Sequence, residues 1–95
     1  MTEPVSTTGP QIRLAPGIVF REEDEGYLLY DVERDVLYRG NESGRQILAL
    51  CDGRRTLAEI VNALAVAHNL PDGAVEPKVR AFLEGLQIQG LAERA

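Results

Sequence analysis

The sequence predicts a small α+β domain in which a three-stranded antiparallel sheet is followed by three helices. The first half of the chain holds three short segments rich in β-branched and aromatic residues, each bounded by turn residues. The second half holds three segments with apolar residues at helical spacing, bounded by capping and turn residues. A chain of 95 residues has room for one modest core of this kind.

The expected strands are residues 18–21, 27–30 and 36–39. The acidic run 22–25 with Gly26 separates the first two strands, and residues 32–35 separate the second from the third, so both connections are short enough for hairpins. The third strand leads directly into the first helix. We therefore expect at least one edge of this sheet to stay unpaired, and an open edge is either a liability or a docking site.

The first expected helix is opened by Asn41, whose side chain can cap it, and is ended by Asp52 and Gly53. Its apolar face carries Ile47, Leu48 and Cys51. A free thiol in such a stripe is usually a small buried apolar group.

Thr56 and Glu59 have the spacing of a capping box, which predicts the start of a second helix that ends near His68. Residues 70–73 form a loop, and the third helix is expected to hold Pro77 in its first turn. The apolar stripe of this third helix consists of Val79, Phe82, Leu83 and Leu86.

Residues 1–12 are rich in Pro, Ser, Thr and Gly and are predicted to form a disordered N-terminal tail, which leaves residues 13–95 as the folded domain. The net charge of −5 comes from the first half, since residues 1–53 hold ten acidic and five basic residues and residues 54–95 hold five of each. Nucleic acid is a poor partner for such a chain. One cysteine, no long apolar stretch and no signal peptide indicate a cytoplasmic protein away from membranes.

No set of residues in the sequence is typical of catalysis. Ser43 lies in no nucleophile elbow, Cys51 and His68 fall on different elements, and the glycines form no phosphate-binding loop. The acidic run 22–25 lacks the alternating ligand spacing of a calcium loop. The sequence therefore predicts a binding module that is not an enzyme and needs neither metal nor cofactor.

Several matched positions, in a fixed order over about residues 16–92, resemble the PqqD-like peptide chaperones, the recognition elements for ribosomally made and modified peptides. They are Leu14-x-Pro16-Gly17, the segment 28–39, Asn41-x-Ser43-Gly44-x-x-Ile47-Leu48, Cys51-Asp52-Gly53-x-x-Thr56, Glu59-Ile60 with Leu64, and Phe82-Leu83-x-x-Leu86-x-x-x-Gly90-Leu91. The resemblance implies a winged helix-turn-helix-like fold. It also implies that the leader segment of a precursor peptide docks as an added strand on the third strand, beside the third helix.

Carried over by position, the resemblance places peptide binding on two segments. The docking strand consists of Val36, Leu37, Tyr38 and Arg39, and the neighbouring helix presents Lys78, Phe82 and either Arg80 or Ala81. Phe82 would offer an apolar wall, and Lys78 and Arg39 would face acidic leader residues. The implied function is a non-catalytic chaperone that hands the precursor to a maturation enzyme, either a radical SAM enzyme or a leader peptidase.

The chain also departs from PqqD proper. Its segment at Val32-Glu33-Arg34 is two residues longer, and Gly40-Asn41 replaces the usual Leu-Asn, a spacing closer to recognition proteins of lasso-peptide and radical-enzyme pathways. The alternative from another class is a winged-helix transcriptional regulator, although neither the second nor the third helix is strongly basic. A further alternative is that the free sheet edge serves only homodimerisation.

Overall fold

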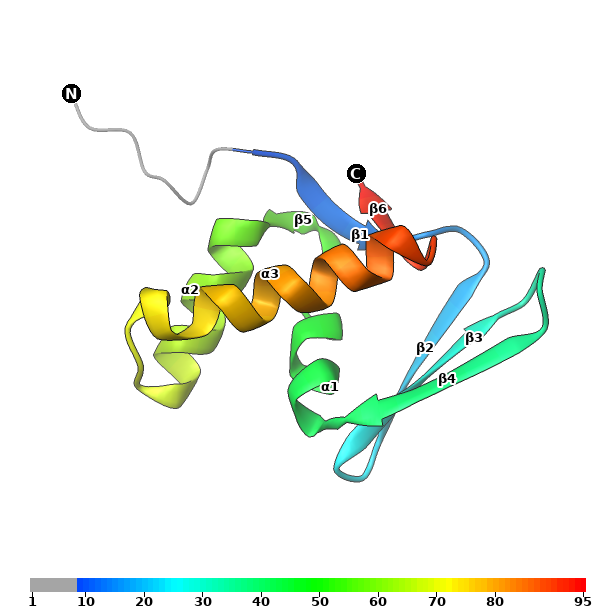
Figure 1. Cartoon of the computed structure of the whole chain (residues 1–95), viewed down its shortest axis with the longest axis horizontal. Coiled ribbons are helices and arrows are strands. Elements are labelled where there is room, and N and C mark those ends of the chain that lie inside the picture. Colours follow the sequence, from blue (N-terminus) through cyan, green and yellow to red (C-terminus); the bar gives the residue numbers. More distant parts are fainter. Residues whose placement is uncertain (1–8) are drawn as a thin grey trace.

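The computed structural model describes residues 9–95 and confirms the expected α+β fold (Figure 1). Its elements in chain order are β1 (Gln11–Leu14), β2 (Ile18–Glu23), β3 (Gly26–Asp31), β4 (Val36–Asn41), α1 (Glu42–Leu48), β5 (Asp52–Thr56), α2 (Leu57–His68), α3 (Asp72–Ile88) and β6 (Ala92–Arg94). The strands form two antiparallel three-stranded sheets with the orders β2-β3-β4 and β5-β1-β6.

The sheet β2-β3-β4 is the expected one, with slightly longer strands. Glu22 and Glu23, expected in the turn, extend β2, so that the turn itself is only two residues long and places Glu25 at φ 62°. One face of this sheet packs on the core through Leu29, which is completely buried. Within residues 9–95, β4 pairs with β3 on one side only.

The second sheet was not expected from the sequence. It joins the beginning and the end of the described chain, since β1 pairs with both β5 and β6. The boundary of the predicted tail was therefore too late, because β1 begins at Gln11 and buries the side chain of Ile12. The rest of the predicted tail, residues 1–8, lies outside the described residues.

Both expected N-terminal caps are present. The Asn41 side chain accepts a hydrogen bond from the Gly44 N–H at 3.1 Å, and Thr56 and Glu59 form the reciprocal bonds of a capping box. Helix α1 ends earlier than expected, at Leu48, because the segment containing Gly53 pairs with β1 as strand β5.

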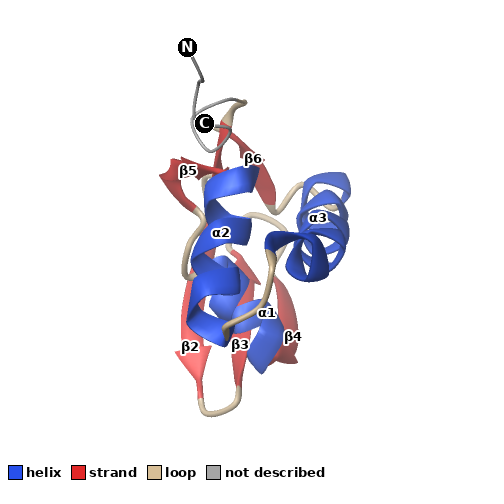
Figure 2. Cartoon of the chain, turned by 90° about the vertical axis from the view of Figure 1, so that its left-hand side faces the viewer, coloured by secondary structure: helices blue, strands red, loops and turns tan. Residues whose placement is uncertain are grey.

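The loop before α3 is shorter than predicted. The helix begins at Asp72, which places Pro77 in the second turn and not in the first. Buried side chains from all three helices and both sheets form one core: Ile12, Leu29, Ile47, Leu48, Cys51, Ile60, Val61, Leu64, Val79, Leu83, Leu86, Leu91 and Ala92. In Figure 2, α3 lies on the same side of the molecule as β4.

Candidate peptide-binding face

The free side of β4 exposes main-chain hydrogen-bonding groups. The N–H of Val32 donates at 3.0 Å to the chain just before β2, so this residue turns its main-chain groups away from β4. Since these groups alternate along a strand, those of Asp31 point to β4, and its partner Val36 points back to β3. The N–H and C=O groups of Leu37 and Arg39 therefore point outward, where an added strand could pair with them.

The side chains of β4 alternate between two faces of the sheet. Val36 and Tyr38 share the face of buried Leu29, and Tyr38 packs partly against the core. Leu37 and Arg39 lie on the opposite, outer face, where 52% of the Leu37 side chain is exposed. The four predicted strand residues thus lie on one edge but present two different surfaces.

Two aromatic rings connect α3 to this sheet. Phe82 of α3 meets Tyr27 of β3 edge to face, with ring centroids 6.1 Å apart and ring planes at 87°. Burial raises the pKa of Tyr27. The rings fit closely because glycines lie beneath them: a Cβ on Gly40 would stand 2.1 Å from Tyr27, and one on Gly44 would stand 2.5 Å from Tyr27 and 3.1 Å from Phe82.

The other predicted residues of α3 lie on different sides of the helix. Lys78 and Ala81 are exposed, and Phe82 is half-buried. Arg80 instead forms an ion pair with Glu76, which raises the pKa of Arg80, and lines a separate cavity beside Leu57 of α2. The structure therefore brings Lys78 and Phe82 together on one side of α3 and turns Arg80 away from them.

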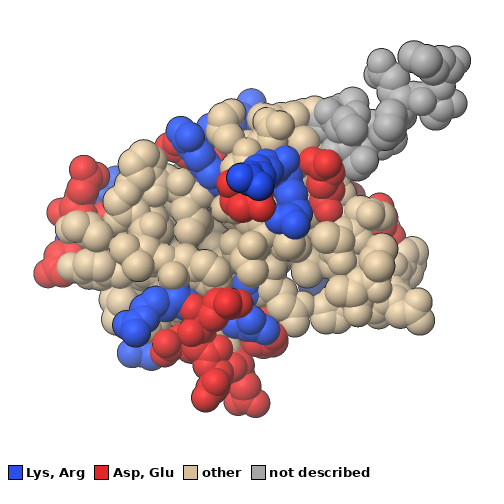
Figure 3. Space-filling model, turned by 180° about the vertical axis from the view of Figure 1, so that it is seen from behind, with Lys and Arg blue, Asp and Glu red and all other residues tan. Residues whose placement is uncertain are grey.

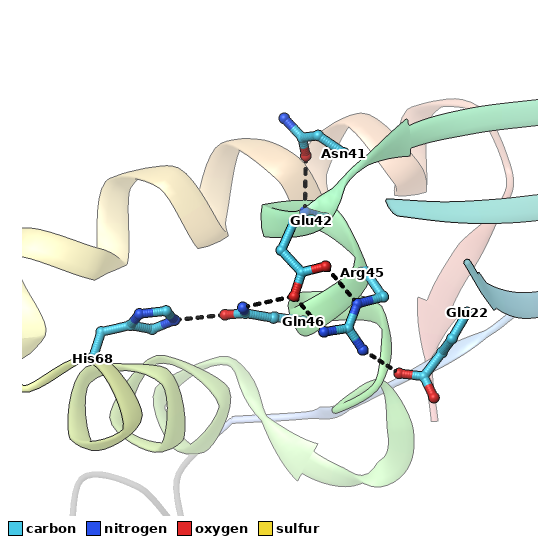
Figure 4. A network of polar contacts seen from close by, with 7 residues as sticks. Glu22, Asn41, Glu42, Arg45, Gln46 and His68 are labelled. Atoms are coloured by element: carbon cyan, nitrogen blue, oxygen red, sulfur yellow. Dashed lines mark hydrogen bonds and ion pairs between the residues drawn. The ribbon is translucent and has the colours of Figure 1, made fainter. Parts of the chain in front are cut away.

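A polar network holds α1 against its neighbours at the Asn41 end of β4 (Figure 4). Arg45 bonds to Glu42 within α1 and, at 2.7 Å, to Glu22 of β2. The Arg45 and Gln46 hydrogen bonds lower the pKa of Glu42 to about 2. Gln46 in turn contacts His68 at the end of α2, with 2.5 Å between Oε1 and Nε2. The network therefore ties α1 to the sheet and to α2.

A cavity of about 330 Å³ opens between α1, α2 and α3 beside this network. Its lining combines apolar side chains, among them Val75 and Val79 from α3, with the charged side chains of Lys78 and Glu42. The sequence predicted neither this cavity nor the close packing of Tyr27 on Gly40 and Gly44. Glycines inside a strand and a helix were the available signal, because such glycines often mark a close approach.

On the face seen in Figure 3, the Lys and Arg side chains of the described residues are interspersed with Asp and Glu, so this face has no basic area of the kind that binds nucleic acid. Among residues 9–95, no group of three or more His, Cys, Asp or Glu side chains is placed to hold a metal ion. The described part of the chain also has no helix that is both long and apolar enough to cross a membrane.

The fold and this face define a small binding domain, with an open strand edge beside a helix, an arrangement suited to extended peptides. The chain belongs to the PqqD family, since the family model described as "Coenzyme PQQ synthesis protein D (PqqD)" matches residues 26–92. No curated protein matches the chain.

Two solved structures share the fold. One is "TbiB1 in Complex with the TbiA(beta) Leader Peptide", at a TM-score of 0.75 and 22% identity over 85% of this chain and 94% of that chain. The other is "Lasso peptide synthetase B1 complexed with the leader peptide", at a TM-score of 0.72 and 24% identity over 87% of this chain and 98% of that one. The shared fold covers nearly all of each solved chain and most of this one.

Proposed function

We propose that this chain is a non-catalytic peptide chaperone that binds the leader segment of a ribosomally made precursor. The leader adds to β4 as a further strand and lies beside Lys78 and Phe82 of α3. The observation that carries the proposal is the free β4 edge, with the main chain of Leu37 and Arg39 facing outward, in a chain of the PqqD family. The two solved proteins of the same fold, each bound to a leader peptide, support it.

Main-chain hydrogen bonds to β4 supply affinity in this mechanism, and side-chain contacts supply selectivity. Tyr38 and Phe82 offer apolar surface to the inward side chains of the added strand, and the cavity between the helices takes a side chain beyond the end of β4. The bound leader raises the local concentration of the precursor at a maturation enzyme, either a radical SAM enzyme or a leader peptidase. The chaperone itself contributes no reacting group.

The test is a fluorescence anisotropy titration with labelled leader peptides from short reading frames adjacent to the gene. We expect micromolar or tighter binding, and Leu37→Pro should weaken it about tenfold or more, because proline removes an outward N–H and its ring blocks the incoming strand. Leu37→Ala is the matched control, since it shortens the same side chain and keeps the N–H.

The two variants separate strand addition from other modes of binding. If Leu37→Pro and Leu37→Ala lose the same leader affinity, the Leu37 side chain and not the strand edge binds the peptide. Binding of duplex DNA in place of any leader, with an affinity that falls steeply with salt, would establish the regulator alternative. Concentration-dependent sedimentation would reveal self-association, which the homodimer alternative requires.

A further inference from the structure

The candidate peptide-binding face, formed by β4 and by the side of α3 that carries Phe82, has a cation at each end. Lys78 is exposed on α3 and lines the cavity that α3 shares with α1 and α2. Arg34 belongs to the turn between β3 and β4, and its guanidinium donates to the Gln89 carbonyl at the end of α3 at 3.3 Å. The turn and the helix are therefore linked at the Val36 end of β4 by one long arginine side chain.

Neither cation is held by a close carboxylate. Lys78 makes no ion pair with any residue in the described range 9–95. Arg34 has one long ion pair, with 3.8 Å between its Nε and Oδ2 of Asp31, and 65% of the Arg34 side chain is exposed. By contrast, Arg13 reaches a carboxylate at 2.6 Å. A ligand can therefore engage Lys78 and Arg34 without breaking a tight internal pair.

The separation of the two cations matches a short stretch of extended peptide. Gln89 follows Lys78 by eleven residues at the end of α3, which at about 1.5 Å per residue corresponds to about 16 Å. An extended strand covers that length in about five residues at about 3.3 Å each. Because side chains on one face recur at every second residue, the matching peptide positions are four or six residues apart.

We propose, resting on the proposed function, that Lys78 and Arg34 are specificity-determining residues that select a leader with two acidic side chains four residues apart, the shorter of the two matching spacings. An apolar side chain lies between them against Phe82, which follows Lys78 by one helical turn. On binding, Arg34 exchanges the Gln89 carbonyl for a peptide carboxylate.

The charge of the whole chain makes these two cations selective. With a net charge of −5, the protein as a whole disfavours an acidic peptide, and a register that brings both carboxylates to the cations offsets this. Glu42, which lines the same cavity as Lys78, already accepts hydrogen bonds from Arg45 and Gln46. The Glu42 carboxylate is thus already paired within α1 and is little available to Lys78.

The test uses three synthetic labelled peptides with the patterns Glu-x-Leu-x-Glu, Gln-x-Leu-x-Gln and Lys-x-Leu-x-Lys in the same threonine-rich frame. Each pattern reads the same in both directions, so the comparison does not depend on the orientation of the added strand. We expect the glutamate peptide to bind about tenfold more tightly than the lysine peptide at low salt, with the difference shrinking at high salt.

Charge reversal on the protein completes the test. Lys78→Glu and Arg34→Glu should each weaken the glutamate peptide about threefold to tenfold and strengthen the lysine peptide by a similar factor. Arg54→Glu is the matched control, because Arg54 is an exposed arginine of β5, in the other sheet, and makes no ion pair among the described residues. It should change both affinities little.

The outcomes separate this proposal from the proposed function. If wild type binds the three peptides equally, or binds none of them at millimolar concentration, the acidic-spacing proposal is wrong. The same holds if Arg54→Glu acts as strongly as the other two reversals. The leader titration with Leu37→Pro decides the proposed function independently of these results.

Discussion

Gly44 shows how one missing side chain shapes the candidate site. It lies in α1 beneath the contact of Tyr27 with Phe82, where a Cβ would stand 2.5 Å from the tyrosine ring. Gly44→Ala should therefore lower the free energy of unfolding by about 1–2 kcal/mol, because the steric cost exceeds the gain in helix propensity. Urea denaturation monitored by circular dichroism measures the change.

Gly85 provides the opposite case within α3. Nothing lies within 4 Å of a Cβ placed there, so Gly85→Ala should raise the free energy of unfolding by about 0.5–1 kcal/mol. If both glycine substitutions stabilise the protein, the rings above Gly44 move aside easily and do not form a fixed wall for a peptide.

Cys51 is a structural residue and not a reactive one. Its thiol is buried, and burial raises its pKa from the ordinary value to about 12, with a smaller contribution from Asp52. The folded state therefore favours the neutral thiol. The resulting stabilisation is fully present below the ordinary pKa of a thiol, and it is lost as the pH rises from that value to about 12. At mildly alkaline pH, iodoacetamide should modify Cys51 about a hundredfold more slowly in the folded protein than in urea. Equal rates would mean that the thiol is accessible.

At the scale of elements, the cavity between α1, α2 and α3 extends the face beyond the end of β4. Ala74 of α3 is exposed and lines this cavity. Ala74→Phe should fill the cavity and weaken leader binding about tenfold, with little effect on stability, if a peptide side chain enters there. The same anisotropy titration measures the loss.

Ala67→Phe is the control for this prediction, because Ala67 is an exposed alanine of α2 that lies outside the cavity lining. Equal effects of the two phenylalanines would show that the cavity is not specifically involved.

The elements that the sequence predicted correctly have strong local signals. The Asn41 cap, the capping box at Thr56 and the alternating strands each depend on residues a few positions apart. Strands β1, β5 and β6 have no such signal, because β5 contains Gly53 between charged residues and β6 is three residues long. They are strands only because distant segments pair.

At the scale of the whole molecule, the difference between local signals and contacts distant in sequence also explains which parts of the candidate site could be predicted. The open edge of β4 and its neighbour Phe82 could be predicted, the latter through the family resemblance. Helical geometry alone puts Lys78 and Arg80 on different sides of α3, because they are two residues apart, but only packing decides which of these sides lies toward the sheet. The contact of Arg34 with the end of α3 spans 55 residues of sequence and has no local signature.

The pairing of β1 with β6 brings the two ends of the described chain together, and the Ala95 N–H donates to the Gln11 carbonyl at 2.8 Å. Both ends thus belong to the sheet β5-β1-β6, whereas the free edge of β4 belongs to the sheet β2-β3-β4. A geometry of this kind suits circular permutation and insertion into a surface loop of another protein. The domain could therefore be inserted into another protein through two neighbouring strands, and the free edge of β4 would stay unobstructed.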